Sequence, residues 1–373
     1  MKSKDLIHKI LETTKDSRDA QTFLDEFRKQ NLVFACLFVS LDTLQENFYS
    51  IFHQTLQLKE LGIFPLLVLP RSARKSLRVY FEFEKQFHKE IERFPFYFIR
   101  NETDLSVKIE KAKSVPKIPI FLSKVSENSS LILNLSKIIS ISKFLFLDSR
   151  GPIVDLSNGK ILPFLSPGRE LEALKKSHPL YEDFFRLVNL LLEGEGKHLH
   201  LVITFPDQLF TELFTIKGSG TLARRRSKIH SYRLLSEVEM ERLKELMETS
   251  FQKKLRNHFW DRPFDKLLLE ENYQGCVWLE KTETGTILSK FAVTAKARGL
   301  GIGRDLWEEL CESTESFFWR SKPNNSINPW YMKMADGYQR TTDWLLFWRG
   351  ISKEKIPKII DTLISRSEDF ESF

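Results

Sequence analysis

The chain has 373 residues, more than one hydrophobic core usually supports, so its length predicts two domains. Its composition, 42% hydrophobic and 29% charged, is that of an ordinary globular protein and excludes a disordered chain. The formal net charge of +7 suits anionic small ligands, although a lysine-rich solvated surface explains it equally well. We therefore do not expect a nucleic-acid-binding protein.

Metal, disulfide and membrane signals are all weak. Cys36, Cys276 and Cys311 are far apart and lack the spacing of a disulfide framework or a zinc site. His198 and His200 would share one face of a strand, but no third ligand stands at a suitable spacing, so we expect no metal. No apolar run reaches the length of a membrane span, and acidic residues near the N-terminus argue against a leader, which favours a cytoplasmic protein.

The first half of the chain has the pattern of a parallel α/β domain. Residues 1–29 contain apolar side chains at helical spacing and predict an amphipathic helix. Residues 32–40 and 63–70 are apolar runs typical of buried parallel strands, with helices between them. A further strand at 144–148 leads into a turn and a hairpin at 157–160.

The second half contains a glycine loop between a strand and a helix. Residues 288–293 predict a strand, and the helix is expected from about 304 to 316. Glycines let backbone N–H groups approach an anion closely, and a helix N-terminus adds a partial positive charge. Pyrophosphate would suit such a loop, although a tight turn at a helix start has the same pattern. A dinucleotide-binding unit is excluded, because no βαβ unit with an acidic partner follows.

The spacing of Arg298, Gly301 and Gly303 resembles the signature loop of the GCN5-related N-acetyltransferases. The blocks that follow it resemble, in order, the transferase domain of vertebrate-type N-acetylglutamate synthases and of bacterial synthase-kinases. These blocks are residues 317–322, 325–331, 335–337 and 344–350. The chain departs from the family pattern at four positions, Ser289, Lys322, Ser326 and Ala335.

Two upstream blocks agree with this resemblance. Residues 211–222 resemble the segment that closes the amino-acid-kinase domain of these synthases, and residues 250–255 resemble the start of their substrate region. The segment 144–160 resembles amino-acid kinases. The resemblance implies an α/β fold with a helical segment (1–29), a degenerate amino-acid-kinase-like regulatory domain (30–223) and a mixed α/β acetyltransferase domain (230–373).

The kinase-like domain lacks the features that kinases use to hold phosphate. Amino-acid kinases place glycines after the first and second strands, but residues 35–40 and 69–73 contain none. Pro70 also removes a backbone donor from the second of these segments. We therefore expect no N-acetylglutamate kinase activity.

The resemblance implies how the transferase domain would bind acetyl-CoA. The strand at 288–293 would splay from the strand at 316–320, and the thioester would lie in the opening. Backbone N–H groups near Phe291 and Val293 would then hold the pantetheine and polarise the thioester carbonyl. The pyrophosphate would lie on the loop of Arg298, Gly299, Gly301 and Gly303.

The acceptor site follows from the same resemblance. Lys253, Lys290 and Arg320 would bind the two carboxylates of L-glutamate. An unpaired charge is costly inside an apolar strand, which favours a ligand-facing role for Lys290. Tyr331 would protonate the leaving thiolate, and Asn325 would position the amine.

Three further expectations concern regulation and packing. L-arginine would bind near Glu212, Gly218 and Gly220, although Glu212 as a helix cap beside a simple turn explains the same residues. Family members imply a homo-oligomer, often a tetramer. We expect the N-terminal helix to pack on its own domain, although in arginine-sensitive relatives it interlaces protomers. Trp344, Phe347 and Trp348 fit helical spacing and are expected in the core.

Three functions remain open from the sequence. The resemblance favours acetyl-CoA:L-glutamate N-acetyltransferase, which starts arginine biosynthesis. The second is an arginine-sensing protein with a silent transferase domain, which would predict loss of a catalytic group. The third is an acetyltransferase for another amino acid, for which Lys322 and Ser326 leave room.

Overall fold

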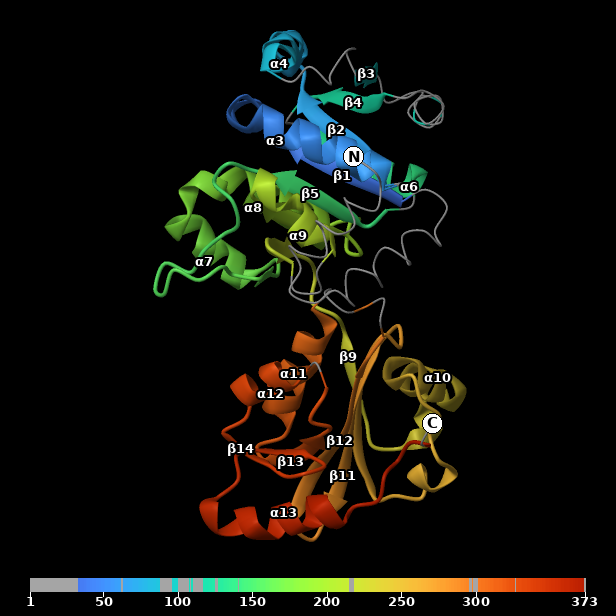
Figure 1. The fold of residues 1–373 in the computed structure, drawn as a ribbon. Coiled ribbons are helices and arrows are strands. Elements are labelled where there is room, and N and C mark those ends of the chain that lie inside the picture. Colours follow the sequence, from blue (N-terminus) through green and yellow to red (C-terminus); the bar gives the residue numbers. More distant parts are fainter. Residues whose placement is uncertain are drawn as a thin grey trace. The chain divides into compact units, whose positions relative to one another are not determined.

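We describe the protein from a computed structural model. It describes residues 33–61, 63–87, 96–99, 117–124, 127–139, 141–214, 218–294, 301–325 and 327–371, together with Val107, Ile109 and Ala297. The predicted helix in residues 1–29 lies outside this part of the chain, as do Arg298 and Gly299. The chain divides into two compact units, Met1–Arg225 and Arg226–Phe373, which we describe separately (Figure 1).

The described residues of the N-terminal unit form an eight-stranded sheet with the order β3-β4-β2-β1-β5-β7-β8-β6. The strands are β1 (Val33–Val39), β2 (Ile63–Pro70), β3 (Phe96–Ile99), β4 (Ile118–Ser123), β5 (Lys143–Leu147), β6 (Phe164–Leu165), β7 (His200–Thr204) and β8 (Thr221–Ala223). Neighbouring strands pair in parallel, except that β8 is antiparallel to β7. The two predicted buried strands are therefore confirmed.

Helices cover both faces of this sheet. The helices α3 (Leu41–Glu60), α4 (Ala73–Phe87) and α9 (Leu209–Phe214) share one core with it. The helices α6 (Asn128–Ile138), α7 (Arg169–Ser177) and α8 (Glu182–Glu193) share the other. Because both faces are covered, the central strands are apolar along their whole length.

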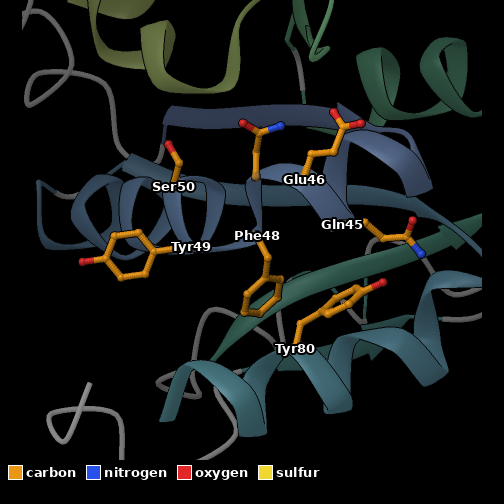
Figure 2. A pocket seen from close by; sticks show the side chains of 7 residues that line it. Gln45, Glu46, Phe48, Tyr49, Ser50 and Tyr80 are labelled. Carbon is orange, nitrogen blue, oxygen red and sulfur yellow. The ribbon is translucent and has the colours of Figure 1, made fainter. Parts of the chain in front are cut away.

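The turn from β1 into α3 is closed by a side chain. The Ser40 hydroxyl caps the helix by accepting a hydrogen bond from Thr43 N at 3.2 Å. Further along, Asn47 interrupts the helix, and its Nδ2 donates to Ser149 Oγ at 2.9 Å. A pocket of about 440 Å³ lies at this irregular turn, where Phe48 of α3 faces Tyr80 of α4 (Figure 2). None of the predicted site residues lines this pocket.

The described residues of the C-terminal unit form a seven-stranded sheet with the order β14-β15-β13-β12-β11-β10-β9. The strands are β9 (Ile229–Tyr232), β10 (Phe264–Glu270), β11 (Gly275–Thr282), β12 (Gly285–Val293), β13 (Phe317–Ser321), β14 (Gly337–Arg340) and β15 (Leu345–Arg349). Neighbours are antiparallel, except that β12 and β13 are parallel. A parallel sheet domain followed by a mixed sheet confirms the predicted fold class.

In the described residues, helices pack on both faces of the second sheet (Figure 1). The helices α11 (Ile302–Ser313) and α12 (Asn328–Met334) share a core with Leu288, Trp319 and Phe347; we call this side the α11 face. The helices α10 (Met240–Phe251) and α13 (Ile356–Ser365) share cores with Trp278 and Phe318, which point to the opposite side, the α10 face.

The helical spacing read from the last aromatic block was wrong. Phe347 and Trp348 lie on β15, and Trp344 immediately precedes that strand. A short apolar run that is covered on both faces has the same pattern as a buried helix, so periodicity alone does not separate them. Phe347 is in the core, as expected. Trp344 and Trp348 pack against the core under α13. Trp344 also lies beneath two cations, with Arg320 Cζ 4.0 Å and Lys322 Nζ 3.8 Å from its ring centre.

Candidate active site

The strands β12 and β13 separate soon after they meet. In the described chain their parallel pairing consists of Ile287 with Phe318. On its other edge β12 contains a bulge: Leu288 pairs with Leu279 and Lys290 with Trp278, so Ser289 is the extra residue. The bulge places Leu288 and Phe291 on the α11 face, whereas Lys290 contacts Phe259 on the α10 face.

The free edge of β12 carries the two predicted amides. Phe291 lies opposite Val277 and Val293 lies opposite Gly275. Thr294 N donates to Gln274 O at 2.9 Å, and hydrogen-bonded and non-hydrogen-bonded pairs alternate in an antiparallel ladder. The N–H groups of Phe291 and Val293 therefore point away from β11, toward β13. Within the described part they lie beyond the single β12–β13 pair, where a carbonyl oxygen can accept from them.

The start of α11 lies beside this edge. Gly301 is the N-cap residue with φ of 81°, a conformation that favours glycine. Gly303 packs on β12, since a Cβ built there would lie 3.6 Å from Val293 Cγ2. Asp305 Oδ2, in the first turn, accepts from Ser227 N at 2.8 Å. The structure thus brings Gly301 and Gly303 close to Val293.

Tyr331 lies on α12 and faces the same side. Its side chain is 6% exposed, and its ring centre is 5.4 Å from that of Trp319 and 6.4 Å from that of Phe291. In the part of the chain that the structure describes, its hydroxyl has no hydrogen-bond partner. Burial raises the pKa of Tyr331 well above its usual value, so the phenol is a neutral donor at pH 7.

Asn325 has a different setting. It is exposed in the loop between β13 and α12. Its Nδ2 donates to Ser321 Oγ at 3.0 Å, and its Oδ1 accepts from Ile327 N at 3.3 Å. Both ends of the amide therefore shape the loop that leads into the helix of Tyr331.

The predicted carboxylate-binding cations gather on the α10 face. Lys290 is 4% exposed and forms an ion pair with Asp369. Burial lowers the pKa of Lys290 to about 8, against the opposing effect of Asp369. Lys253 is half-buried just after α10, and its charge helps to lower the pKa of Glu368.

Arg320 lies at the end of α13 instead of free in the opening. Its Nη1 donates to the carbonyl oxygens of Leu363 and Arg366, both at 2.7 Å. Its Nη2 donates to Ser367 O at 2.9 Å. These contacts satisfy carbonyl groups that a helix C-terminus otherwise leaves unpaired.

Several charged residues of this site were not identified from the sequence. Glu280, 1% exposed, accepts from both terminal nitrogens of Arg366 at 2.5 and 2.7 Å. Arg366 also donates to Ser289 Oγ at 2.9 Å, at the position where the family has an aspartate. Asp369 pairs with Arg262 at 2.6 Å as well as with Lys290. The cost of a charge inside an apolar strand favoured a ligand-facing role for Lys290. In the structure its partner is Asp369, 79 residues further along the chain.

The predicted effector residues form a closed network in the N-terminal unit. Glu212 is 6% exposed, and its carboxylate accepts from Lys143 Nζ at 2.8 Å and from Ser219 N and Gly220 N at 2.8 and 2.9 Å. Gly218 has φ of 64°, and a Cβ there would lie 2.6 Å from Glu212 Oε2. The carboxylate thus holds the turn. An arginine guanidinium would have to take the place of Lys143.

Comparison with known proteins first defines the class. Residues 229–366 match the family model of the N-acetyltransferase domain of N-acetylglutamate synthase. The C-terminal unit is therefore similar in sequence to the N-acetyltransferase domains of this family. In the described residues, no group of three or more His, Cys, Asp or Glu could hold a metal ion. No helix in the same part is long and apolar enough to cross a membrane.

The relatives narrow the class further. The chain is 32% identical over 256 residues to acetylglutamate kinase of Xylella fastidiosa strain 9a5c, covering 65% of this chain and 61% of that protein. It is 33% identical over 244 residues to mitochondrial N-acetylglutamate synthase of Danio rerio, covering 62% and 45%. The chain is thus homologous to N-acetylglutamate synthases and related acetylglutamate kinases, and spans about half to three fifths of their length. N-acetylglutamate synthase of Neisseria gonorrhoeae, solved with coenzyme A and N-acetylglutamate, aligns with a TM-score of 0.47 and 14% identity over 90% of this chain and 98% of that one.

Proposed function

We propose that this protein is an acetyl-CoA:L-glutamate N-acetyltransferase, an N-acetylglutamate synthase, which catalyses the first step of arginine biosynthesis. The observation that carries the proposal is the free edge of β12. It lies between the hydroxyl of a buried tyrosine, Tyr331, on the α11 face and a group of cations on the α10 face. If an acyl donor binds at this edge, an anionic acceptor bound by the cations of the α10 face can reach its acyl group.

The residues of the α11 face would hold and activate the donor. The N-terminus of α11, with Gly301 and Gly303, suits the pyrophosphate of coenzyme A. The N–H groups of Phe291 and Val293 would donate hydrogen bonds to the thioester carbonyl oxygen and stabilise the oxyanion that forms on attack. We assign Arg298 and Gly299 to the same loop on the resemblance alone.

The residues of the α10 face would hold the acceptor. Lys253, Lys290 and Arg320 would bind the carboxylates of glutamate, with its neutral amine directed at the thioester. The amine attacks the carbonyl carbon to form the C–N bond of a tetrahedral intermediate. This intermediate collapses as the C–S bond breaks and the coenzyme A thiolate leaves, and the nitrogen gives up its extra proton to solvent, which restores a proton to the thiolate. Asn325 would keep α12 in place for this step.

Tyr331 would donate a hydrogen bond to the leaving sulfur. Because burial raises the pKa of the phenol above that of a thiol, full transfer is uphill. A hydrogen bond from the phenol that strengthens as negative charge grows on sulfur is favourable, and this is the role we assign to Tyr331.

A transferase for another amino acid is the second candidate. It is favoured by one observation, the pairing of Lys322 with Glu368 at 2.5 Å, at a position where the family has arginine. A silent arginine sensor is less well supported, since the predicted tyrosine, asparagine and cations are all present. The kinase-like unit would serve regulation in either case.

One assay separates these functions. Thiol release from acetyl-CoA is measured with L-glutamate, L-aspartate, L-glutamine and further amino acids, each with and without L-arginine. We expect turnover with glutamate and a several-fold effect of arginine, because coupling energies between sites are typically ~1–3 kcal/mol. Turnover confined to another amino acid would establish the second candidate, and no turnover at all would leave a sensor.

Assembly, compartment and effector site are proposals of the same kind. We propose a homo-oligomer, a tetramer by resemblance, in the cytoplasm, with arginine bound near Glu212, Gly218 and Gly220. The boundaries 1–29, 30–223 and 230–373 belong to this proposal. A monomer mass in light scattering would contradict the homo-oligomer. Calorimetry that detects no heat on addition of millimolar arginine would contradict the arginine site.

A further inference from the structure

Residues 366–370, which follow α13, form an acidic strap across the α10 face. On one side Phe370 forms an antiparallel bridge with Leu255, and Arg256 N donates to Asp369 O at 2.9 Å. On the other side Arg320 holds the backbone carbonyl groups of the strap. Figure 1 shows the chain after α13 running toward α10. The strap therefore connects the end of β13 to the segment that begins at Lys253.

The two carboxylates of the strap lie on cations that we assign to glutamate. Glu368 pairs with Lys322 at 2.5 Å, and Lys253 is close enough to lower its pKa further. Asp369 pairs with Lys290 and with Arg262. Two adjacent residues thus present two carboxylates to two separate groups of cations.

The buried cations differ in whether their ion-pair partner belongs to the strap. Arg366 is balanced by Glu280, which belongs to β11. Lys290 has the Asp369 carboxylate as its ion-pair partner, although it is buried. An unpaired buried charge is costly, so the strap can leave only if another anion takes its place. A dicarboxylate would replace both strap carboxylates at once, and a monocarboxylate would replace only one.

We propose that the strap is an internal dicarboxylate that occupies the acceptor site and is displaced when a dicarboxylate substrate binds. The inference rests on the proposed function, because it takes these cations as the glutamate site. Because the dicarboxylate binds only when the strap is open, its apparent affinity equals its intrinsic affinity multiplied by the fraction of molecules with an open strap. It also adds Lys322 and Arg262 to the residues that select a dicarboxylate.

Amide hydrogen exchange of the full chain tests displacement without turnover. The probe is glutarate, which has the carboxylates of glutamate but no amine to acetylate. We expect the Arg256 amide, which donates to the strap, to exchange at least several-fold faster at saturating glutarate. The Thr341 amide, which donates to Trp344 O at 2.8 Å in the β14–β15 hairpin, is the control and should not change. Unchanged exchange of Arg256 overturns the proposal, whether or not the chain acetylates glutamate.

A pair of variants tests the competition. Glu368→Gln removes one strap carboxylate, whereas Glu371→Gln makes the same charge change at an exposed side chain beyond the strap. We expect glutarate to bind the Glu368 variant about two- to threefold more tightly than the unaltered protein, because a half-exposed ion pair contributes little. Its affinity for the Glu371 variant should be unchanged. Equal affinities in calorimetry would overturn the proposal. Absence of thiol release with glutamate would instead remove the proposed function and leave strap displacement by glutarate standing.

Discussion

The two faces of β12 hold the two halves of the candidate site in different states. On the α11 face, the Tyr331 side chain is buried and its hydroxyl has no partner among the described residues. On the α10 face, Lys290 and Arg320 are already engaged by the end of α13 and the strap. The bulge at Ser289 places Lys290 on the α10 face, although Leu288, two residues earlier, lies on the α11 face. On the function we propose, the donor half is therefore ready for its ligand, whereas the strap has to leave the acceptor half first.

The largest expected effect on the kinetics comes from a substitution on the α11 face. Tyr331→Phe should lower kcat by ~10²–10⁴-fold with little change in the glutamate KM, because the hydroxyl acts as charge develops on sulfur. Steady-state kinetics with both substrates measures this. Tyr338→Phe, an exposed tyrosine on β14, is the matched control. A Tyr331 variant within about twofold of the wild-type kcat would remove this residue from the mechanism.

Arg320→Ala tests the α10 face, where we place the acceptor. Loss of a charge-assisted carboxylate contact should raise the glutamate KM about ten- to a hundredfold and leave the acetyl-CoA KM nearly unchanged. Arg349→Ala removes an arginine from β15 whose Nη1 donates to Met334 O at 3.1 Å, and should leave the glutamate KM unchanged. If Arg320→Ala weakens acetyl-CoA instead, the assignment of the two faces is reversed.

The pKa of Lys290 predicts a pH dependence of acceptor binding. Lys290 is charged below its pKa of about 8 and loses its charge above it, so dicarboxylate binding should weaken as the pH rises from 7 to 9. We expect the inhibition constant of glutarate to rise up to about tenfold by pH 9. Glutarate itself does not titrate in this range. Lys290→Arg keeps its charge and should give a flat profile, and a flat profile in the unaltered protein would contradict a charged Lys290 as a ligand.

The smallest effect is expected at the start of α11. Gly301→Val forces a β-branched residue to φ near 81°, which should raise the acetyl-CoA KM several-fold and spare the glutamate KM. Gly303→Ala is the matched comparison, because its Cβ would make only ordinary contacts. Equal effects of the two substitutions would mean that the conformation of Gly301 is not what positions the helix N-terminus.

The local parts of the site were predictable from the sequence, and the distant ones were not. The strand, the glycines and Tyr331 follow one another within a short stretch of chain, so periodicity and resemblance locate them. Asp369 is 79 residues from Lys290, and nothing in a linear pattern pairs the two. The bulge at Ser289 was also not visible, because alternation along the strand would place Leu288 and Lys290 on one face. Trp344 was assigned to a helix for a related reason. A strand that is buried on both faces does not alternate between polar and apolar residues, so its pattern resembles that of a buried helix.

The most direct test of the account is a crystal structure with coenzyme A and N-acetyl-L-glutamate bound. We predict the acetamide at the free edge of β12, its oxygen near the Phe291 N–H and the coenzyme A sulfur near the Tyr331 hydroxyl. The two carboxylates of the product should lie on Lys290 and Arg320, with residues 366–370 displaced. A product bound with its carboxylates on the α11 face, or beside an undisturbed strap, would contradict the account.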